Sequence, residues 1–166
     1  TDWGAHMFDI VQWALGMDHT GPVEFIPPSG EREFMTIRYE NGISMTHEQF
    51  GRGNAVRFIG SEGVLDVSRS FLETDPASLV EKEMEPDDVL LYESENHYED
   101  FLQAVRNRTK PICDVEIGHR TASICNIANI AYELNRTLQW DPEKEKFLRD
   151  SEANLMRKRK ARQDWR

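Results

Sequence analysis

Apolar residues in the opening stretch, TDWGAHMFDIVQWALGMD, recur at the spacing of one helix face. The residues of this apolar stripe are Met7, Ile10, Val11, Ala14 and Leu15. Asp2, His6 and Asp9 stand at positions i, i+4 and i+7, so a helix would project them together from the opposite side. The pattern therefore predicts an amphipathic helix with one polar edge.

Between residues 23 and 68 the pattern changes to strands. The segment VEFIPPSG predicts a short strand that runs into a loop, and EFMTIRYENGISMTHEQF predicts a hairpin. Its turn, Glu40-Asn41-Gly42, contains the Asn-Gly pair typical of a type I′ turn. A second hairpin is expected in AVRFIGSEGVLDVSR, with Gly60 and Gly63 around its turn. Since no helix interrupts these strands, the sheet should be largely antiparallel.

Helical spacing returns in the last part of the chain. One helix is expected at residues 96–108 and a longer one at 115–135, while Asp150 or Ser151 should cap a last short helix. The apolar face of the first of these helices consists of Tyr98, Phe101, Leu102 and Val105. Residues 74–95 are acidic and indicate a loop with one short strand at 89–92. The predicted fold class is α+β, as one domain over residues 1–166: an open, largely antiparallel sheet with helices packed on one face.

The first predicted hairpin has apolar residues at both alternating sets of positions. One set is Met35, Ile37, Tyr39, Ile43 and Met45, and the other is Phe34, Thr36, Ser44 and Thr46. Because the helices of residues 96–135 can cover only one face, the other face would leave apolar side chains exposed. We therefore expect a homodimer, or a higher homo-oligomer, that forms through the open sheet face.

Composition excludes several classes of protein. With 166 residues, 39% hydrophobic and 30% charged, the chain is a globular domain, and no apolar run is long enough to span a membrane. A net charge of −10 disfavours binding to nucleic acid, and the basic run RKRKAR at 157–162 is interpreted as a solvated helix end. Cys113 and Cys125 lack zinc-ligand spacing and are expected to be buried free thiols.

His6 is the first candidate for chemistry. An imidazole titrates near neutral pH, and the carboxylate of Asp2, one helical turn away, could orient it and favour its charged form, as acid-base catalysis requires. Three alternatives stay open at this point: Asp2 is only a helix N-cap, His6 is an ordinary surface histidine, or both bind a metal with Asp9. The metal hypothesis lacks a fourth ligand at suitable spacing.

His119 and Arg120, in the segment EIGHRT, form a second candidate. They stand at the start of the long predicted helix, where free N–H groups and the helix dipole favour a substrate or phosphate oxygen, although a structural role is the favoured alternative. Trp3, Trp13 and Trp140 could stack on sugar rings, although packing in the interior is the commoner position of tryptophan. His47 could line a sugar pocket or pack within the sheet.

The opening D-W-G-A-H-M-F-D-I-V-Q-W-A-L-G resembles the start of the C-terminal domain of the Gfo/Idh/MocA oxidoreductases. The resemblance continues through FIGSEGVLDV, EDFLQAVRNRTKPICDVEIGHRTASICNIANIAYELNRTLQWDPEKEKF and DSEANLMRKRKARQDW. It implies the substrate-side half of a two-domain dehydrogenase whose Rossmann half binds NAD or NADP. This chain has no G-x-G-x-x-G after a strand, and Lys110-Pro111 does not match the family's Glu-Lys-Pro segment, so the chain alone should bind no cofactor and be inactive.

By the same resemblance, His6 would act as general base on a substrate hydroxyl with Asp2 beside it, and Asp9 would support the helix or the substrate. The substrate would be a sugar or a polyol, with His119 and Arg120 as further candidate binding residues. Two other functions remain open: an NAD-dependent glycosidase of the same family, and a stand-alone interaction module without catalysis. No nucleic acid or membrane partner is expected, and the cytoplasm is the default compartment.

Overall fold

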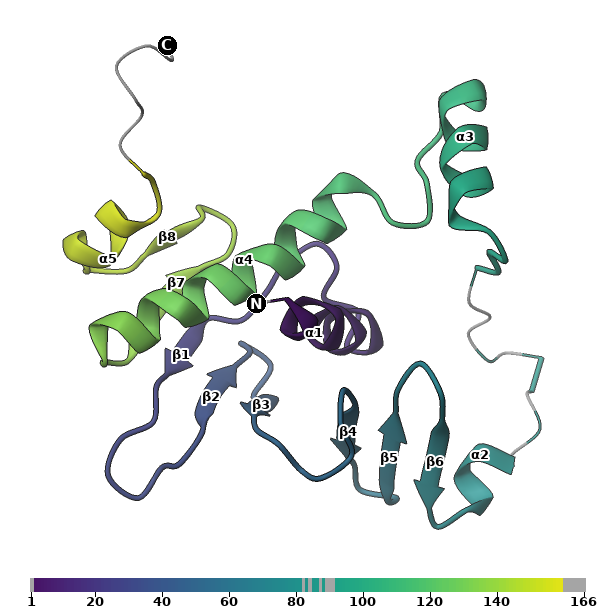
Figure 1. Ribbon diagram of the computed structural model, residues 1–166, viewed down its shortest axis with the longest axis horizontal. Coiled ribbons are helices and arrows are strands. Elements are labelled where there is room, and N and C mark those ends of the chain that lie inside the picture. The colour runs from purple at the N-terminus through teal and green to yellow at the C-terminus, as the bar shows by residue number, and fades with distance from the viewer. Residues whose placement is uncertain (1, 82, 84, 87, 89–91, 160–166) are drawn as a thin grey trace. The chain divides into compact units, whose positions relative to one another are not determined.

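The computed structural model describes residues 2–81, 83, 85–86, 88 and 92–159 (Figure 1). The chain forms two compact units: residues 1–51 together with 120–166, and residues 52–119. Helices and antiparallel sheets occur in both, which confirms the predicted α+β class.

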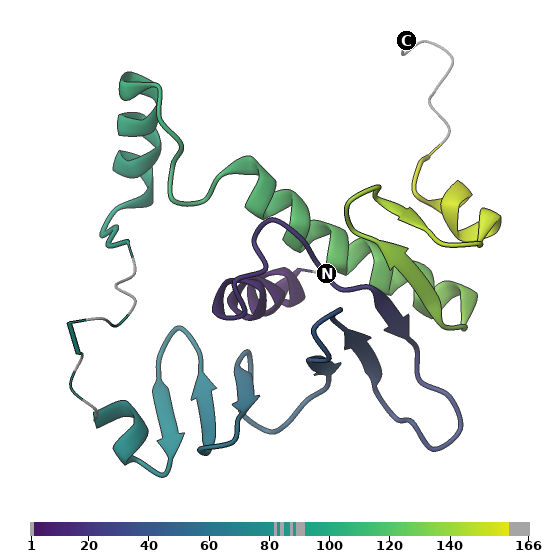
Figure 2. The same cartoon turned by 180° about the vertical axis from the view of Figure 1, so that it is seen from behind.

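The first unit is built on a five-stranded sheet in the order β3-β2-β1-β7-β8, with every neighbouring pair antiparallel. Its strands are β1 (Glu24–Ile26), β2 (Met35–Arg38), β3 (Ser44–His47), β7 (Leu138–Asp141) and β8 (Lys146–Phe147). Its helices are α1 (Trp3–Ala14), the larger part of α4 (Val115–Leu134) and α5 (Ser151–Met156). The views from both sides show β7 returning beside β1 after α4 (Figures 1 and 2).

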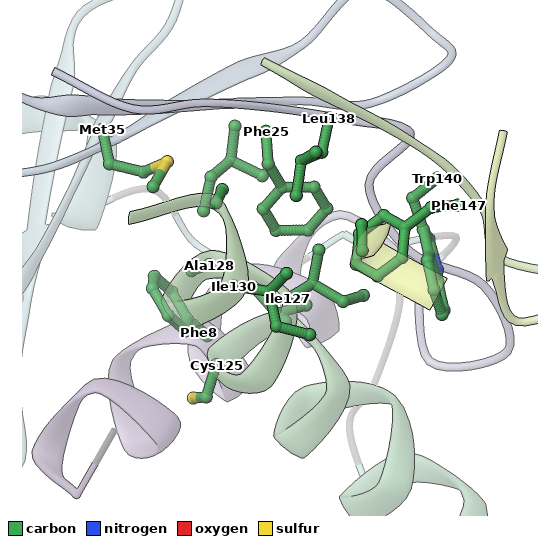
Figure 3. Close-up of a cluster of buried hydrophobic side chains, with 14 residues drawn as sticks. Phe8, Phe25, Met35, Cys125, Ile127, Ala128, Ile130, Leu138, Trp140 and Phe147 are labelled. Atoms are coloured by element: carbon green, nitrogen blue, oxygen red, sulfur yellow. The ribbon is translucent and has the colours of Figure 1, made fainter. Parts of the chain in front are cut away.

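The core of this unit lies between the sheet and its helices. Phe25, Ile37 and Leu138 face one another across three strands, and each is at most 1% exposed. They belong to one buried cluster with residues of α4 such as Ile127 and with Phe8 of α1 (Figure 3). Burial of each such large side chain contributes about 1.5–3 kcal/mol, so this face holds α1 and α4 on the sheet.

The first hairpin is confirmed, but its predicted turn type is wrong. Gly42 has φ of 88°, whereas Asn41 is not among the residues with positive φ that a type I′ turn requires at both central positions. The Gly42 amide donates to the Tyr39 carbonyl, and the Tyr39 amide donates to the Ile43 carbonyl. This is the three-residue connection in which a glycine at positive φ forms a bulge after the turn.

The expectation of apolar side chains on both faces of this hairpin is also wrong for most of its strand residues. The positions that alternate with the core are Thr36, Arg38, Ser44 and Thr46, all polar. On neighbouring strands Arg38 Nη1 lies 3.1 Å from Glu24 Oε2, and Gln139 Nε2 donates to Glu24 Oε1 at 2.5 Å. At these positions the open face is therefore polar, while Met35 and Ile37, which alternate with them, are buried; Ile26, the cross-strand partner of Thr36, is an apolar residue in the same row.

The second unit contains a three-stranded sheet in the order β4-β5-β6. Its elements are β4 (Val56–Ile59), β5 (Val64–Val67), β6 (Leu72–Asp75), α2 (Ser78–Glu81) and α3 (His97–Asn107). The β4–β5 hairpin is the second one expected from the sequence. Gly63 in its turn has φ of 153°, and a Cβ there would lie 2.2 Å from the Asp75 carbonyl oxygen, so this position needs glycine.

An ion-pair network crosses this smaller sheet. Arg57 binds both carboxylate oxygens of Asp66 at 2.7 Å, and Arg52 pairs with Asp66 and with Glu73. Asp66 is only 6% exposed, and its hydrogen bonds from Arg57 lower its pKa. Bidentate pairing offsets the cost of burying this carboxylate.

Several local predictions need correction. The α3 residues expected in the core are 44–72% exposed, and the helices that cover the core face of the five-stranded sheet are α1 and α4. The structure adds β6, α2 and the β7–β8 hairpin, which the sequence did not indicate, while most of the strand expected at 89–92 falls outside the described residues.

Cys125 is a buried free thiol as expected, but Cys113 is exposed. Asn96 caps α3 and Asp150 caps α5 through side-chain hydrogen bonds.

Candidate functional site

The helix that carries the candidate acid-base residues, α1, is fixed to the sheet by a buried polar residue. Gln12 is 1% exposed, and its Nε2 donates to the carbonyl oxygens of Met17 at 2.9 Å and Thr20 at 3.1 Å. Its Oε1 accepts a hydrogen bond of 2.9 Å from the Tyr39 hydroxyl, just after β2. Burial raises the pKa of Tyr39 well above its ordinary value, so the phenol remains a neutral donor at physiological pH.

A second polar contact joins α1 to α4. The hydroxyl of Thr121 donates to Asp9 Oδ1 at 2.8 Å, and Thr121 is 5% exposed. Asp9 was expected to support the helix or to bind substrate. The structure shows its carboxylate in a helix-to-helix hydrogen bond.

An aromatic contact holds the same helix against β3. The rings of Phe8 and His47 meet edge to face with centroids 5.5 Å apart. Partial burial lowers the pKa of His47, which favours the neutral imidazole. His47 therefore packs on α1, in agreement with the alternative that it is part of the sheet's packing.

The side of α1 that these contacts leave exposed carries His6 and Asp2. His6 is exposed, and its ring centroid lies 5.3 Å from that of Trp3, which is 43% exposed. Trp13, two helical turns beyond His6, is 51% exposed. Asp2 occupies the N-cap position with φ of 61°, but its side chain accepts no capping hydrogen bond from the described amides of α1. The N-cap alternative therefore does not account for this carboxylate, and the exposed face combines an imidazole, a carboxylate and two aromatic rings.

Arg120 and His119, the second candidate pair, belong to different units. The side chain of Arg120 is 17% exposed; its Nη1 donates to the Pro142 carbonyl at 2.6 Å and lies 3.6 Å from Glu145 Oε1. Arg120 thus anchors the β7–β8 turn to α4, at the edge of a small pocket that Ser123 and Trp140 also line. His119 is exposed and belongs to the second unit.

Cofactor and metal binding were tested against the described residues. In the described part of the chain no glycine-rich turn leads from a strand into a helix, so these residues do not fit a dinucleotide phosphate site. Over the same residues, no group of three His, Cys, Asp or Glu side chains is placed to hold a metal ion. None of the described helices is long and apolar enough to cross a membrane.

Sequence reasoning missed three residues that position α1: Gln12, Tyr39 and Thr121. One signal was available for Gln12, because it falls on the buried side of α1 between apolar positions, where a polar residue must find partners. Tyr39 and Thr121 are 27 and 112 residues away from their partners on α1, and no local pattern reports such distant contacts.

An antiparallel sheet covered on one face by two helices, with an exposed imidazole on the first helix and a carboxylate at its N-cap, defines an α+β domain. The family model described as "Oxidoreductase family, C-terminal alpha/beta domain" matches residues 1–166. The chain belongs to the Gfo/Idh/MocA oxidoreductase family and is its C-terminal domain. Comparison with curated proteins and with solved structures gave no match. The family is of the Rossmann type and is generally NAD(P)-dependent.

Proposed function

We propose that this chain is the substrate-side domain of an NAD(P)-dependent dehydrogenase that oxidises a sugar or a polyol, with His6 as the general base. The observation that carries the proposal is the exposure of His6 on α1, with Asp2 at the N-cap, while Gln12 and Asp9 fix the helix through their hydrogen bonds. A general base needs a defined position and access to substrate, and this helix provides both.

In the proposed reaction His6 accepts the proton of the substrate hydroxyl as the carbinol carbon is oxidised. Asp2, one helical turn before His6, stabilises the imidazolium that forms. The residues that the structure describes do not fit the nicotinamide cofactor, so the hydride acceptor would be held by a separate nucleotide-binding domain. The domain alone is therefore expected to be inactive.

The aromatic rings beside His6 favour a carbohydrate-like substrate. Trp3 and Trp13 expose large ring faces on the same side of α1, and the C–H face of a sugar ring stacks on such surfaces. His119 and Arg120 remain candidate substrate-binding residues, with Arg120 also serving the β7–β8 turn.

Substitution of His6 in the intact two-domain enzyme tests the proposal. His6→Ala should lower turnover by roughly 10²- to 10⁴-fold, since that is the usual contribution of a positioned general base. Asp2→Asn should have a smaller effect, and His19→Ala, an exposed histidine in the loop after α1, should have none. NADH formation would be followed with D-glucose and myo-inositol as first substrates. Unchanged turnover of the His6 variant on an oxidised substrate would contradict the assignment.

We further propose that the domain forms a homodimer through the open face of its five-stranded sheet. The support is the resemblance to oxidoreductases that associate through this sheet, together with an exposed polar face that carries the Arg38–Glu24 pair. In a two-fold arrangement such pairs can be made between copies as well as within one. A polar interface of this kind should weaken as salt concentration rises.

A further inference from the structure

The carboxylate of Asp9 has two possible neighbours, only one of which it contacts. His6 lies one helical turn earlier on α1, and side chains at this i, i+3 spacing have Cβ atoms about 5–6 Å apart. Thr121 lies on α4, and its hydroxyl donates to Asp9 Oδ1 at 2.8 Å. This contact directs the carboxylate toward α4.

The burial of Thr121 favours its hydrogen bond to Asp9. At 5% exposure its hydroxyl has little access to water, so it depends on a protein acceptor, and a charged acceptor strengthens the bond. Without the hydroxyl, Asp9 would lose this partner and could rotate to the His6 imidazole. The Asp9 carboxylate would then change the hydrogen bonding of the ring.

We propose that Thr121 is a positioning residue, whose hydroxyl holds Asp9 against α4 and so keeps this carboxylate away from the His6 imidazole. The inference rests on the proposed function of His6 and Asp2. It assigns to α4 a role in the acid-base site that does not depend on substrate contact.

The first test uses nuclear magnetic resonance of the His6 ring nitrogens in the 166-residue chain at pH 7. Thr121→Val, which keeps the side-chain shape and removes the donor, should shift these signals, and Thr121→Ser should leave them as in the unsubstituted chain. In Asp9→Asn/Thr121→Val the signals should return, because the Asp9 charge is gone. Ser123→Ala, on the same helix, is the matched control and should cause no shift.

Two results would overturn the inference: His6 signals that do not move in Thr121→Val, or signals that move and are not restored by the added Asp9→Asn. If Thr121→Val fails to fold, Thr121→Ala carries the same expectation. A general loss of packing would not be reversed by Asp9→Asn, so the double variant separates positioning from a merely structural effect.

Kinetics of the intact enzyme provide the second test. Thr121→Val should lower kcat by roughly 10- to 100-fold with KM changed less than about twofold, and Thr121→Ser should restore turnover. The proposed function of His6 and the positioning role of Thr121 can be contradicted independently of each other. Unchanged turnover in His6→Ala contradicts the function whatever the resonance result, whereas unmoved His6 signals contradict the role of Thr121 even when His6 is essential.

Discussion

Removal of the Tyr39 hydroxyl should lower the free energy of unfolding of the first unit, and the loss can be derived from the burial and hydrogen bond of this group. Tyr39 is 3% exposed, and its hydroxyl makes a 2.9 Å hydrogen bond to Gln12 Oε1. In Tyr39→Phe this acceptor is left buried without that donor, and such a loss costs about 1–3 kcal/mol. Gln12→Leu should cost more, about 2–4 kcal/mol, because the Met17 and Thr20 carbonyls lose their donor as well.

A double-mutant cycle isolates the bond between the two side chains. In the Gln12→Leu background the Tyr39 hydroxyl has already lost its acceptor, so Tyr39→Phe should cost less than about 0.5 kcal/mol or stabilise the protein. The expected coupling free energy is therefore about 0.5–3 kcal/mol. Urea unfolding followed by tryptophan fluorescence is suitable, because Trp3, Trp13 and Trp140 all belong to the first unit. Equal costs of Tyr39→Phe in both backgrounds would refute the reasoning.

Burial of Tyr39 also predicts that the free energy of unfolding falls at alkaline pH. Burial raises the pKa of Tyr39 above its ordinary value near 10, so the folded state binds the phenol proton more tightly than the unfolded state. The resulting contribution to stability is complete below pH 10 and declines as pH rises above it. Tyr39→Phe should lose less stability than the unsubstituted chain between pH 9 and pH 11, measured by the same urea unfolding. An equal loss in both proteins would contradict this.

Three further outcomes are expected. Gly63→Ala should destabilise the second unit by about 2–4 kcal/mol, because its Cβ would meet the Asp75 carbonyl. Amide exchange in β5 should become faster in this variant. Gly60→Ala, whose Cβ would lie 3.7 Å from its nearest neighbour, is the control and should leave the exchange rate unchanged. Light scattering should give about twice the chain mass of 19.3 kDa. Thr36→Glu on the open sheet face should yield monomers, whereas the control Ser61→Glu should remain dimeric. A monomeric mass for the unsubstituted chain would contradict the proposed dimer. Calorimetric titration of the chain with NADH or NADPH should show no binding, and micromolar affinity would contradict the absence of a cofactor site.

The sequence predicted most elements with a strong repeating pattern. The helices at 3–14 and 115–134 and both hairpins have apolar residues at a clear period, so local spacing was sufficient. The strands β7 and β8 were missed because they are short and gain their stability from β1 and from the core, more than 100 residues away for β1. Similarly, alternation alone could not show that the polar set at Thr36 and Arg38 faces outward, because the helices that decide this come from distant segments.

The candidate site was predictable in its helical positions but not in its surroundings. Sequence spacing placed His6 and Asp9 within α1, whereas Asp2 lies at the N-cap with φ of 61° and not in the helix as expected. It could not show that Asp9 turns to Thr121, or that Arg120 is engaged with the Pro142 carbonyl, because both partners approach through tertiary packing. Local pattern thus identifies which residues share a face, whereas their partners depend on the whole fold.

The strand order of the first unit has a consequence for synthesis of the chain. Strand β1 lies in the middle of the five-stranded sheet, between β2, which follows it closely, and β7, which is made more than 100 residues later. Until β7 has left the ribosome, the nascent chain presents β1 as an open edge that can pair with other chains. The whole of residues 52–119 is translated in this interval. Chains truncated before residue 138 should therefore aggregate during expression, although every residue of α1 and of the β2–β3 and β4–β5 hairpins is present.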